Sequence, residues 1–596
     1  MIKNYLNTSF LTGILLFSSL GETSAQTAGF GTNEYKKALW MTTRMYGGQR
    51  SGDKNTNAAN WLLIGHPQAQ DGRTFLKDSD GSYDLSGGWF DCGDHVKFGH
   101  TEYYSAYMLL KGYAEFPKGY DDRYDATYSG YRSANNYTFE GNGHKGNNIP
   151  DVLDEVKHAT DYIIKCARDA NTFYYQVGDG VADHKQWVTS ARMQNNGVSD
   201  GGEVRIVHKN PSDGAMPALA GAALALMARI YKPYDNAYAE KCLTHAKYAY
   251  AYAKAHKGQS VGAPGGFYGK NSNPNDAYAA LLGELYWATK DESYKTEALA
   301  MTLAVSGTAD VKGTTWGLDY VNNGDLGAYN LYLLGKPGAD KIFEEIVLTH
   351  YLKQVNTIGL FTGGNATWGP LRYNASAAFV VALWANRNTP TDAMKKFIYS
   401  NIDYIMGKNS KNLSFIVGYG SNYAKQPHHR NVFMSDNNNM NKLSIPSKNQ
   451  PHGYMVGGKR DPNAYQDNIK DYSNTEGGID YSAGLVNALG YINSQLSPIT
   501  KDFPAVELIP SPMLAGLISE EKTSSWSVYP NPSANTFEIN AVANTLIKVY
   551  DQLGNEVASF NTTERTIFGE DLMPGFYHVR FYKGQNGVKS INVVKQ

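Results

Sequence analysis

The sequence contains little charge of either sign. Lysine and arginine number 55, aspartate and glutamate number 56, and charged residues make up 19% of the 596-residue chain, so the formal net charge is −1. A typical globular protein carries roughly a quarter charged residues. Because no basic excess is present to meet a phosphate backbone, the composition excludes a dedicated nucleic-acid-binding protein.

Long apolar runs and cysteines are also scarce. Beyond the N-terminus no stretch of about 18 consecutive apolar residues occurs, which excludes a membrane-spanning helix there. The chain has three cysteines, Cys92, Cys166 and Cys242. An odd and sparse set is not a disulfide framework, although one bridge remains open. Cys166 and Cys242 fall in helical segments, where we expect small buried side chains.

Aromatic residues, in contrast, are abundant. They make up 13% of the chain, with 44 tyrosines and 9 tryptophans, and the hydrophobic content of 42% excludes wholesale disorder. The length predicts a sizeable core and more than one domain. Flat rings with a polar edge fill a core or bind sugars equally well, so the composition alone leaves both roles open.

The first 25 residues have the pattern of a secretory signal peptide. Lys3 supplies a positive start, Phe10–Leu20 is an apolar stretch too short to span a membrane, and Thr23–Ala25 offers a small-residue cleavage site. We therefore expect a mature chain that begins near Gln26. The protein is then secreted or held at the cell surface.

The C-terminal residues 525–596 have the pattern of a small all-β sandwich. Polar and apolar residues alternate in Thr536–Asn540 and in Phe576–Phe581. Turn sequences stand between such segments at Gln552–Asn555 and at Gln585–Gly587, where Asn-Gly favours a tight hairpin.

This region resembles the C-terminal sorting domain of type IX secretion substrates. The resemblance rests on Val528–Pro532, Gly575–Tyr577 and Val593–Lys595. It implies export, with the type IX secretion machinery as a partner; a generic glycan-binding sandwich is the alternative. Residues 497–524 lack clear periodicity and contain several prolines, which predicts a linker.

Between the two ends the pattern is helical, and residues 26–496 form the predicted catalytic domain. About six helical hairpins joined by long loops favour an α/α toroid that presents its loops around one cleft, and an irregular helical bundle is the alternative. Apolar residues recur at helical spacing in segments near 34–47, 101–116, 150–170, 214–232, 236–256, 275–289, 292–303, 323–335, 338–354, 373–387, 390–406 and 479–495.

A first candidate site lies in the loop Gly87–Lys97. Asp91 and Asp94 stand three residues apart across a glycine, so a sharp turn could aim both carboxylates at one point. Paired carboxylates can hold and deprotonate a water molecule. The same pattern also suits a surface Asp-Gly turn, or a metal site that adds His95, and the spacing leaves all three open.

A second candidate follows a strand-like run in Ser414–Arg430. It ends in His428, His429 and Arg430, whose donors could hold the hydroxyl groups of a neutral polar ligand. A zinc site is disfavoured because no cysteine or acidic partner follows at ligand spacing. We interpret His429 as a structural residue.

A third candidate is Glu476, which stands just before two glycines at the start of an apolar helical segment. A glutamate there is often a capping residue of the helix. A nearby ring such as Tyr481 could equally remove water from the carboxyl group and raise its pKa into the range of a general acid.

Together these segments resemble glycoside hydrolase family 9 over about residues 30–495. Trp89–Phe98 is similar to the aspartate-pair motif of the family, with Cys92 where alanine is usual. Ser414–Arg430 fits the histidine–arginine signature at every fixed position.

The last motif keeps the family's spacing in part. Gly478 replaces a usual serine, threonine or alanine, and Ser482 replaces a usual asparagine, so the strict local signature is broken. The retained positions are Tyr465, Asp467, Tyr472 and Glu476.

The resemblance implies an all-α (α/α)6 barrel that hydrolyses β-1,4-glucan with inversion of configuration. In this family pattern Asp94 is the general base, Asp91 helps to hold the attacking water, and Glu476 is the general acid. Inversion requires two carboxyl groups with room for a water molecule between one of them and the sugar.

The same resemblance implies a set of substrate-binding residues, and a β-1,4-glucan is the expected partner of a monomeric enzyme. Aromatic faces would cover the pyranose rings while polar groups bind the hydroxyls. The implied residues are His184, Trp187, Phe267, Tyr268, Trp316, Trp368, Arg372, Tyr373, His428, Arg430 and Tyr481.

No cofactor is expected for the chemistry, but family members commonly hold a structural calcium ion. The corresponding stretch here includes Ser272 and Asp276, with Ala277 where a glutamate is usual. That change removes a hard oxygen ligand from an ion that takes six to eight. A calcium site at Ser272 and Asp276 therefore remains open.

Two other functions remain as alternatives to an endo-β-1,4-glucanase. One is an exo-acting glycosidase, or one of another specificity, on the same scaffold, with mixed-linkage glucan, xyloglucan or chito-oligosaccharide as substrate. The other is a non-catalytic glycan-binding protein, against which the retained Asp91, Asp94 and Glu476 argue.

Overall fold

The computed structural model describes residues 29–51, 78–123, 146–185, 187, 205–314, 316–433, 450–507, 509, 526–541, 545–552, 555–563, 566–583 and 586–596. The predicted signal peptide lies outside these described residues. So do residues 510–524 of the predicted linker and parts of both predicted hairpin turns.

Six helices pack side by side into the inner ring of a barrel. Helix α3 lies between α17 and α7, α9 follows α7, α11 follows α9, and α13 packs against α17. Such helices are buried around nearly their whole circumference, as expected for elements inside a large domain. The six are α3 (Gly99–Glu115), α7 (Ala215–Tyr231), α9 (Pro274–Thr289), α11 (Gly324–Leu333), α13 (Pro370–Arg387) and α17 (Ile479–Leu496).

Six further helices form an outer layer, and each packs against an inner one. Helix α8 buries one face, on which Ala239, Cys242, Ala246 and Ala249 recur at helical spacing, whereas α1 and α4 are buried over most of their surface. The outer helices are α1 (Thr32–Gln49), α4 (Asp151–Cys166), α8 (Asn236–Ala255), α10 (Glu292–Ala300), α12 (Ala339–Glu345) and α14 (Asp392–Met406).

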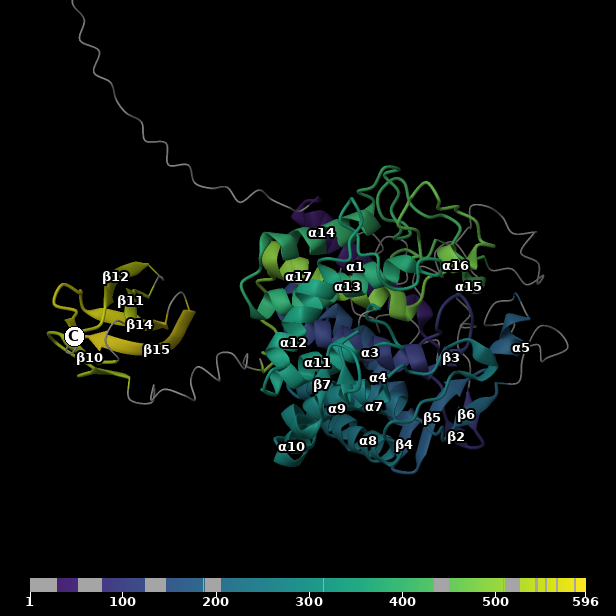
Figure 1. Cartoon of the computed structure of the whole chain (residues 1–596), viewed down its shortest axis with the longest axis horizontal. Coiled ribbons are helices and arrows are strands. Elements are labelled where there is room, and N and C mark those ends of the chain that lie inside the picture. Colours follow the sequence, from purple (N-terminus) through teal and green to yellow (C-terminus); the bar gives the residue numbers. More distant parts are fainter. Residues whose placement is uncertain are drawn as a thin grey trace, which may run out of the picture.

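This arrangement is the (α/α)6 barrel and not an irregular bundle, and Figure 1 shows its helices gathered in one body. All twelve segments predicted from periodicity are helical. The predicted segment 338–354 consists of α12 followed by a π-helical turn at Ile346–Tyr351. On α7, Gly221 permits close approach, because a Cβ there would lie 2.8 Å from Leu281 of α9.

Short strands that periodicity did not reveal stand in the loops on the N-terminal side of α3. Strand β5 (Thr172–Val177) pairs antiparallel with β3 (Lys97–Phe98), β4 (Ala167–Asp169) and β6 (Val207–Lys209). The pairing of β3 with β5 fixes the chain just after the aspartate pair. Two further two-stranded ladders join β1 (Ser79–Asp80) to β2 (Tyr83–Asp84) and β7 (Leu303–Ala304) to β8 (Val311–Lys312).

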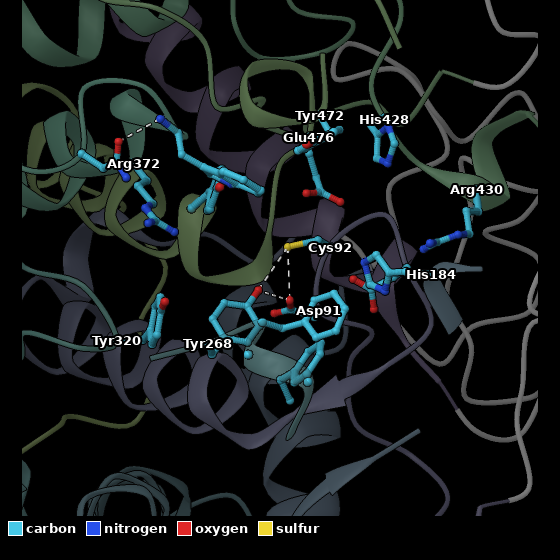
Figure 2. A pocket seen from close by; sticks show the side chains of 18 of the residues that line it. Asp91, Cys92, His184, Tyr268, Tyr320, Arg372, His428, Arg430, Tyr472 and Glu476 are labelled. Atoms are coloured by element: carbon cyan, nitrogen blue, oxygen red, sulfur yellow. Dashed lines mark hydrogen bonds between the residues drawn. The ribbon is translucent and has the colours of Figure 1, made fainter. Parts of the chain in front are cut away.

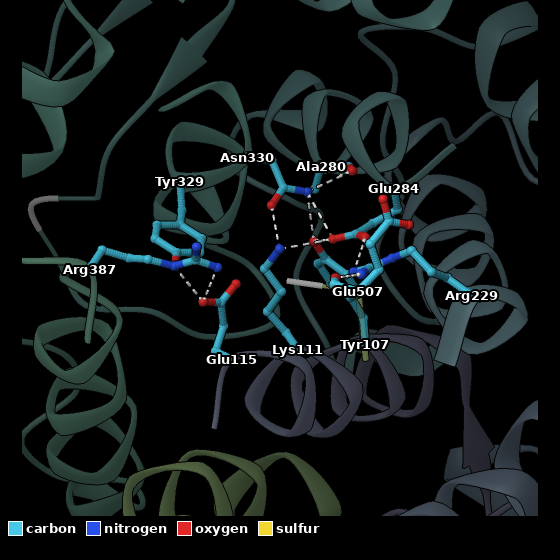
Figure 3. Close-up of polar contacts among 10 residues, drawn as sticks. All are labelled: Tyr107, Lys111, Glu115, Arg229, Ala280, Glu284, Tyr329, Asn330, Arg387 and Glu507. Atoms are coloured by element: carbon cyan, nitrogen blue, oxygen red, sulfur yellow. Dashed lines mark hydrogen bonds and ion pairs between the residues drawn. The ribbon is translucent and has the colours of Figure 1, made fainter. Parts of the chain in front are cut away.

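A cluster of charged and polar side chains is buried in the C-terminal halves of the inner helices (Figure 3). Lys111 Nζ on α3 lies 2.9 Å from Glu284 Oε1 on α9 and 2.7 Å from Asn330 Oδ1 on α11. Arg387 on α13 pairs with Glu115 on α3 at 2.6 Å. Because an unpaired buried charge costs several kcal/mol, each pair fixes the relative position of two ring helices.

The chain that follows α17 lies against the same end of the barrel. Arg229 donates a hydrogen bond of 2.8 Å to the carbonyl oxygen of Glu507, and Arg387 donates to that of Ile509. Ile509 is itself buried. The first part of the predicted linker 497–524 is therefore packed on the helices.

The C-terminal region contains two antiparallel sheets, as predicted. One has the strand order β13-β10-β9 and the other β12-β11-β14-β15, and their apolar faces share a core around Phe537, Val549 and Phe581. The strands are β9 (Ser527–Tyr529), β10 (Phe537–Asn540), β11 (Leu546–Tyr550), β12 (Glu556–Asn561), β13 (Thr566–Phe568), β14 (Gly575–Lys583) and β15 (Asn586–Lys595).

Cys92, Cys166 and Cys242 are all buried and free, so the disulfide bridge that the sequence left open does not form. The expectation of small buried thiols at Cys166 and Cys242 is confirmed. Within the described ranges, no helix combines the length and the apolar character that crossing a membrane requires.

Candidate active site

The polar loops of the barrel meet where the inner helices begin. Asp94 precedes α3, Tyr268 precedes α9, Tyr320 precedes α11, Trp368 precedes α13 and Glu476 precedes α17, and all five line one cavity of about 650 Å³. The inner helices therefore present their N-termini to this cavity. Positive helix ends favour the carboxylate groups that gather there.

A tight turn aims both aspartates into the cavity. The Asp91 N–H donates to the carbonyl oxygen of Val96 at 3.1 Å, and the Val96 N–H donates to Asp94 Oδ1 at 2.7 Å. Asp91 and Asp94 are buried among protein atoms. The surface-turn interpretation is therefore wrong. Among the described residues no group of three or more acidic, histidine or cysteine side chains is placed to hold a metal ion, so the interpretation with His95 as a ligand is wrong as well.

Gly93 is the point where three segments of the chain meet. Its N–H donates to Glu476 Oε1 at 3.3 Å, and its carbonyl oxygen accepts the Arg430 N–H at 3.0 Å. A Cβ at this position would lie only 2.2 Å from the His428 carbonyl oxygen. Glycine is thus required for the aspartate loop to approach the other two motifs.

The Asp91 carboxylate is held by hydrogen-bond donors on both oxygens. Thr101 donates to Oδ1 and Tyr268 to Oδ2, and Cys92 Sγ lies 3.3 Å from Oδ2. Burial raises the pKa of Asp91 well above its ordinary value, and the neighbouring negative charge of Asp94 adds to the rise. The two donors therefore fix the Asp91 carboxyl group in place beside Asp94.

Glu476 faces the two aspartates from another segment, between α16 (Tyr472–Thr475) and α17 (Figure 2). Burial raises the pKa of Glu476 well above its ordinary value, and the charges of Asp94 and Asp91 raise it further. Both effects favour the protonated carboxyl group, which is the form that a general acid requires. The N-cap of α17 is Gly478, so the interpretation of Glu476 as the cap of that helix is wrong.

Two side chains of the cavity lining, Arg430 and His184, contact Asp183, which the sequence analysis did not single out. Arg430 Nη1 lies 3.2 Å and His184 Nδ1 lies 3.6 Å from Asp183 Oδ1. Burial acts to raise the pKa of Asp183, but the charges of Arg430, His95 and His184 hold it below its ordinary value. Asp183 is therefore ionised, and it holds Arg430 and His184 in place from behind the cavity wall.

Aromatic rings form the sides of the cavity. Trp368 and Tyr472 lie with their ring centroids 5.3 Å apart and remain 42% and 51% exposed. Trp187 packs edge-on against His428 at 4.9 Å, and Phe267 packs against His184 at 4.5 Å. Exposed ring faces beside polar groups are the surface that a pyranose ring requires.

His428 and His429 have different surroundings. His428 lines the cavity, donates from Nδ1 to the Ile469 carbonyl oxygen at 2.6 Å, and has its pKa lowered to about 4 by burial. It is therefore neutral in the range where most enzymes work. His429 is buried behind it and contacts Gln49 at 2.8 Å, which confirms its structural interpretation.

Most of the implied site residues are brought together, but two are not in the cavity lining. Tyr373 is buried behind the wall, where it accepts from Arg372 at 2.9 Å and donates to Asp319 at 2.9 Å. Trp316 is 50% exposed and lines a separate cavity. The implied residues that do line the main cavity are Asp91, Asp94, His184, Trp187, Phe267, Tyr268, Trp368, Arg372, His428, Arg430, Glu476 and Tyr481.

Several lining residues were not proposed from the sequence. Tyr472 had been noted for its spacing alone and Phe98 only as the end of the aspartate-pair motif, while Tyr320 and Asn365 lie in loops without a recognisable motif. The sequence feature that could have identified them is their position, since each stands shortly before or after the start of an inner helix or its flanking strand. Asp467 accepts hydrogen bonds from the main-chain N–H groups of residues 425 and 426, and it thereby holds the Ser414–Arg430 motif in place.

The implied calcium residues line the second cavity, of about 240 Å³. Asp276 Oδ1 accepts N–H groups from Asn273 at 2.7 Å and from Lys312 at 2.8 Å. The Ser272 hydroxyl is bonded to Asn322 Oδ1 at 2.8 Å. One carboxylate that already faces two donors, with a lysine in the lining, does not fit an ion that takes six to eight oxygens.

Comparisons with known proteins agree with this geometry. Endoglucanase A of Fibrobacter succinogenes is 34% identical over 448 residues, which are 72% of this chain and 92% of that protein. The solved structure of the cellulase Cel9M of C. cellulolyticum in complex with cellobiose is 29% identical, with a TM-score of 0.62, over 77% of this chain and 97% of that one. The endoglucanase of the termite Nasutitermes takasagoensis is 26% identical, with a TM-score of 0.59, over 77% and 98%.

Two family profiles match separate parts of the sequence. The secretion system C-terminal sorting domain matches residues 527–596, the region of the two sheets. Glycosyl hydrolase family 9 matches residues 35–489, a range that holds all three carboxyl groups of the cavity. The chain therefore belongs to glycosyl hydrolase family 9.

Proposed function

We propose that this protein is a secreted endo-β-1,4-glucanase that hydrolyses internal β-1,4-glucosidic bonds of cellulose and related β-glucans with inversion. The observation that carries the proposal is the meeting of Asp91, Asp94 and Glu476 in one aromatic-lined cavity. The printed names of the relatives, which are endoglucanases and cellulases, support the same reaction and substrate class.

In this proposal Asp94 is the general base and Asp91 holds the water that it deprotonates. Burial raises the pKa of Asp94, but the charges of His184 and Arg430 act against that rise and favour the ionised form. The attacking water gives its proton to Asp94 as its oxygen bonds to the anomeric carbon. Inverting enzymes leave room for this water by separating base and acid by about 6.5–9.5 Å.

Glu476 supplies the proton that the leaving oxygen of the glycosidic bond requires. Its raised pKa favours the protonated form, and the Gly93 N–H orients its carboxyl group toward the cavity. Cleavage of the bond to the leaving sugar and attack by water on the opposite face then invert the anomeric configuration.

The cavity walls suit a neutral glucan. Trp187, Phe267 and Trp368 offer ring faces to the apolar faces of glucose units, while Arg372 and His428 offer polar edges. Because His428 is neutral, hydroxyl recognition there does not depend on a positive charge. The alternatives remain an exo-acting enzyme, another β-glycan as substrate, or a non-catalytic glycan-binding protein.

The test compares the mature protein with its Glu476→Gln variant on carboxymethylcellulose, barley β-glucan, xyloglucan and chitosan. Viscosity and reducing ends are followed together. We expect a steep fall in viscosity with few new ends on carboxymethylcellulose, and a loss of turnover of about three orders of magnitude or more in the variant, with oligosaccharide binding retained. The exposed Glu345→Gln change is the matched control.

Each other outcome selects an alternative. Reducing ends without viscosity loss would indicate exo attack, and activity on chitosan alone would change the substrate class. Near-normal turnover in Glu476→Gln would remove Glu476 from the acid role. An absence of activity on every glycan, with binding retained, would favour the non-catalytic function.

The sorting domain at 527–596 marks the protein for export by type IX secretion. We further propose a mature enzyme that begins near Gln26 and loses its C-terminal region after export. N-terminal sequencing and the intact mass of secreted material test both statements. A secreted protein that retains Gln596 would contradict removal of the domain.

A further inference from the structure

Cys92 stands between the two aspartates in the chain, yet it is neither an acid, a base nor an aromatic wall. Its side chain is 5% exposed and lines the main cavity. The sulfur lies 3.3 Å from Asp91 Oδ2 and 3.7 Å from the Tyr268 hydroxyl (Figure 2). The thiol is therefore in direct contact with the group proposed to hold the attacking water.

The sulfur occupies space left by a missing side chain on another element. Gly478 is the residue from which α17 starts, and a Cβ at that position would lie 2.9 Å from Cys92 Sγ and 2.8 Å from Asp480 Oδ1. Real Cβ atoms essentially never approach so closely, so an alanine at 478 requires the side chains of Cys92 and Asp480 to shift.

The thiol also completes the set of donors around Asp91. Thr101 donates to Oδ1 and Tyr268 to Oδ2, and these two come from α3 and from the loop before α9. The Cys92 thiol belongs to the residue that follows Asp91 in the chain, and it contacts the same Asp91 Oδ2. A buried thiol among carboxyl groups keeps its proton, because a thiolate there would be unpaired and repelled. It can therefore act only as a donor toward the carboxylate.

We propose that Cys92 is a positioning residue for the hydrolysis, because its thiol fills the space beside Gly478 and donates to Asp91, and so sets the orientation of the water-holding carboxylate relative to α17. The inference rests on the proposed role of Asp91. A residue with a packing role needs only the volume of its side chain. The proposed role requires both a hydrogen-bond donor and a side chain of suitable volume at position 92.

The first part of the test separates donor from volume. Cys92→Ser keeps a donor with a smaller atom, whereas Cys92→Ala removes the donor and leaves the space empty. We expect kcat on carboxymethylcellulose to fall about fivefold to twentyfold in Cys92→Ala, with KM changed less than about twofold, and to stay within about threefold of the parent in Cys92→Ser.

The second part tests the shared space. Gly478→Ala alone brings a Cβ against the sulfur, and we expect a loss in kcat that is larger than that of Cys92→Ala. The double variant Cys92→Ala with Gly478→Ala removes the contact with the sulfur and keeps the one with Asp480. It should recover at least about tenfold over Gly478→Ala, although each change is harmful alone, and such non-additivity marks two residues in direct contact.

The pH profile distinguishes positioning from a general loss of packing. Besides the thiol, the groups that face Asp91 are Asp94, Asp480, Glu476 and Tyr268. Loss of a donor disfavours the ionised carboxylate, so the acid limb of kcat in Cys92→Ala moves to higher pH. Cys242→Ala, at a buried thiol on α8 outside the cavity, is the matched control and should keep the parent kcat per folded molecule and the parent profile.

The inference is overturned if Cys92→Ala and Cys92→Ser both keep the parent kcat and pH profile, or if the double variant recovers nothing over Gly478→Ala. These results can be told apart from a failure of the proposed function. If only the inference fails, Glu476→Gln remains inactive while the Cys92 variants work. If the proposed function fails, Glu476→Gln itself retains turnover.

Discussion

Asp183 controls the charge around the proposed base although it does not line the cavity. It pairs with Arg430 at 3.2 Å and contacts His184, and its negative charge acts to raise the pKa of Asp94. Removal of that charge should therefore lower the pKa of Asp94. It should also free Arg430 from the partner that orients it.

We predict two effects of Asp183→Asn. The acid limb of the kcat–pH profile moves to lower pH, because Asp94 stays ionised further into the acid range, and kcat at the optimum falls about tenfold to a hundredfold as Arg430 loses its anchor. The measurement is kcat between pH 4 and 9 on a soluble glucan. Asp392→Asn, at a side chain that is 95% exposed, is the matched control. A shift of the acid limb to higher pH would contradict the argument.

Several of the site residues that the sequence predicted belong to short motifs. Asp91 and Asp94 fall in one turn, and His428 and Arg430 in another, and the resemblance carried by these motifs together favoured them over the alternatives that spacing left open. Asp183 could not be found in this way, because its importance comes from an ion pair with a residue far along the chain. Such pairs leave no local pattern and emerge only when the fold brings the segments together.

At the scale of elements, the helices were predictable and the strands of the barrel loops were not. A helix such as α4 repeats its apolar face over 16 residues and begins with Asp151 and Asp154, whereas β3 contains only two residues and β4 three. A period of two cannot be recognised over so short a span. The sandwich strands were predictable because polar and apolar residues alternate along them, as in the four residues of β10 and the nine of β14, whereas burial does not alternate along the six residues of β5.

The segment after α17 provides a prediction at the same scale. A chain that ends after Ile509 keeps the contacts of Arg229 and Arg387 with main-chain carbonyl oxygens, whereas a chain that ends after Leu496 loses them and uncovers apolar surface. We expect the shorter chain to be less stable by about 2–4 kcal/mol, since hydrogen bonds to charged groups contribute about 1.5–3 kcal/mol each.

Thermal unfolding of the two truncated chains, side by side with the full chain, measures this difference. The chain that ends after Ile509 serves as the control, and it should match the barrel transition of the full chain. Equal Tm values for both truncations would place the true boundary at the end of α17. The catalytic unit would then not include residues 497–509.

At the scale of the whole molecule, the parallel inner helices place the candidate catalytic groups at one end of the barrel and the stabilising ion pairs at the other. Their N-termini surround the cavity, where buried carboxyl groups repel one another, and their C-terminal halves hold paired charges such as Lys111 with Glu284. Clustered like charges in a cleft reduce stability, so the ring depends on contacts at the other end. The periodicity of the sequence predicts the ring, but not which end carries which kind of charge.

The second cavity yields a prediction about global stability. Asp276 is buried, and burial raises its pKa to about 8, although N–H groups of Lys312 and Asn273 oppose that rise. The folded state then holds a proton that the unfolded chain releases near pH 4. This contribution to stability is complete below about pH 4 and is lost as the pH rises through 8.

Two measurements follow from the same argument. The Tm of the parent should fall between pH 5 and 8 more steeply than the Tm of Asp276→Asn, because the asparagine cannot ionise. A chelator should change the Tm of the parent by less than about 1 °C at either pH. A bound calcium ion would reverse both results, because it needs the ionised carboxylate: the chelator would lower the Tm, and Asp276→Asn would destabilise the protein at every pH. The pair of measurements thus decides whether a proton or a cation stabilises the loops between α9 and α11.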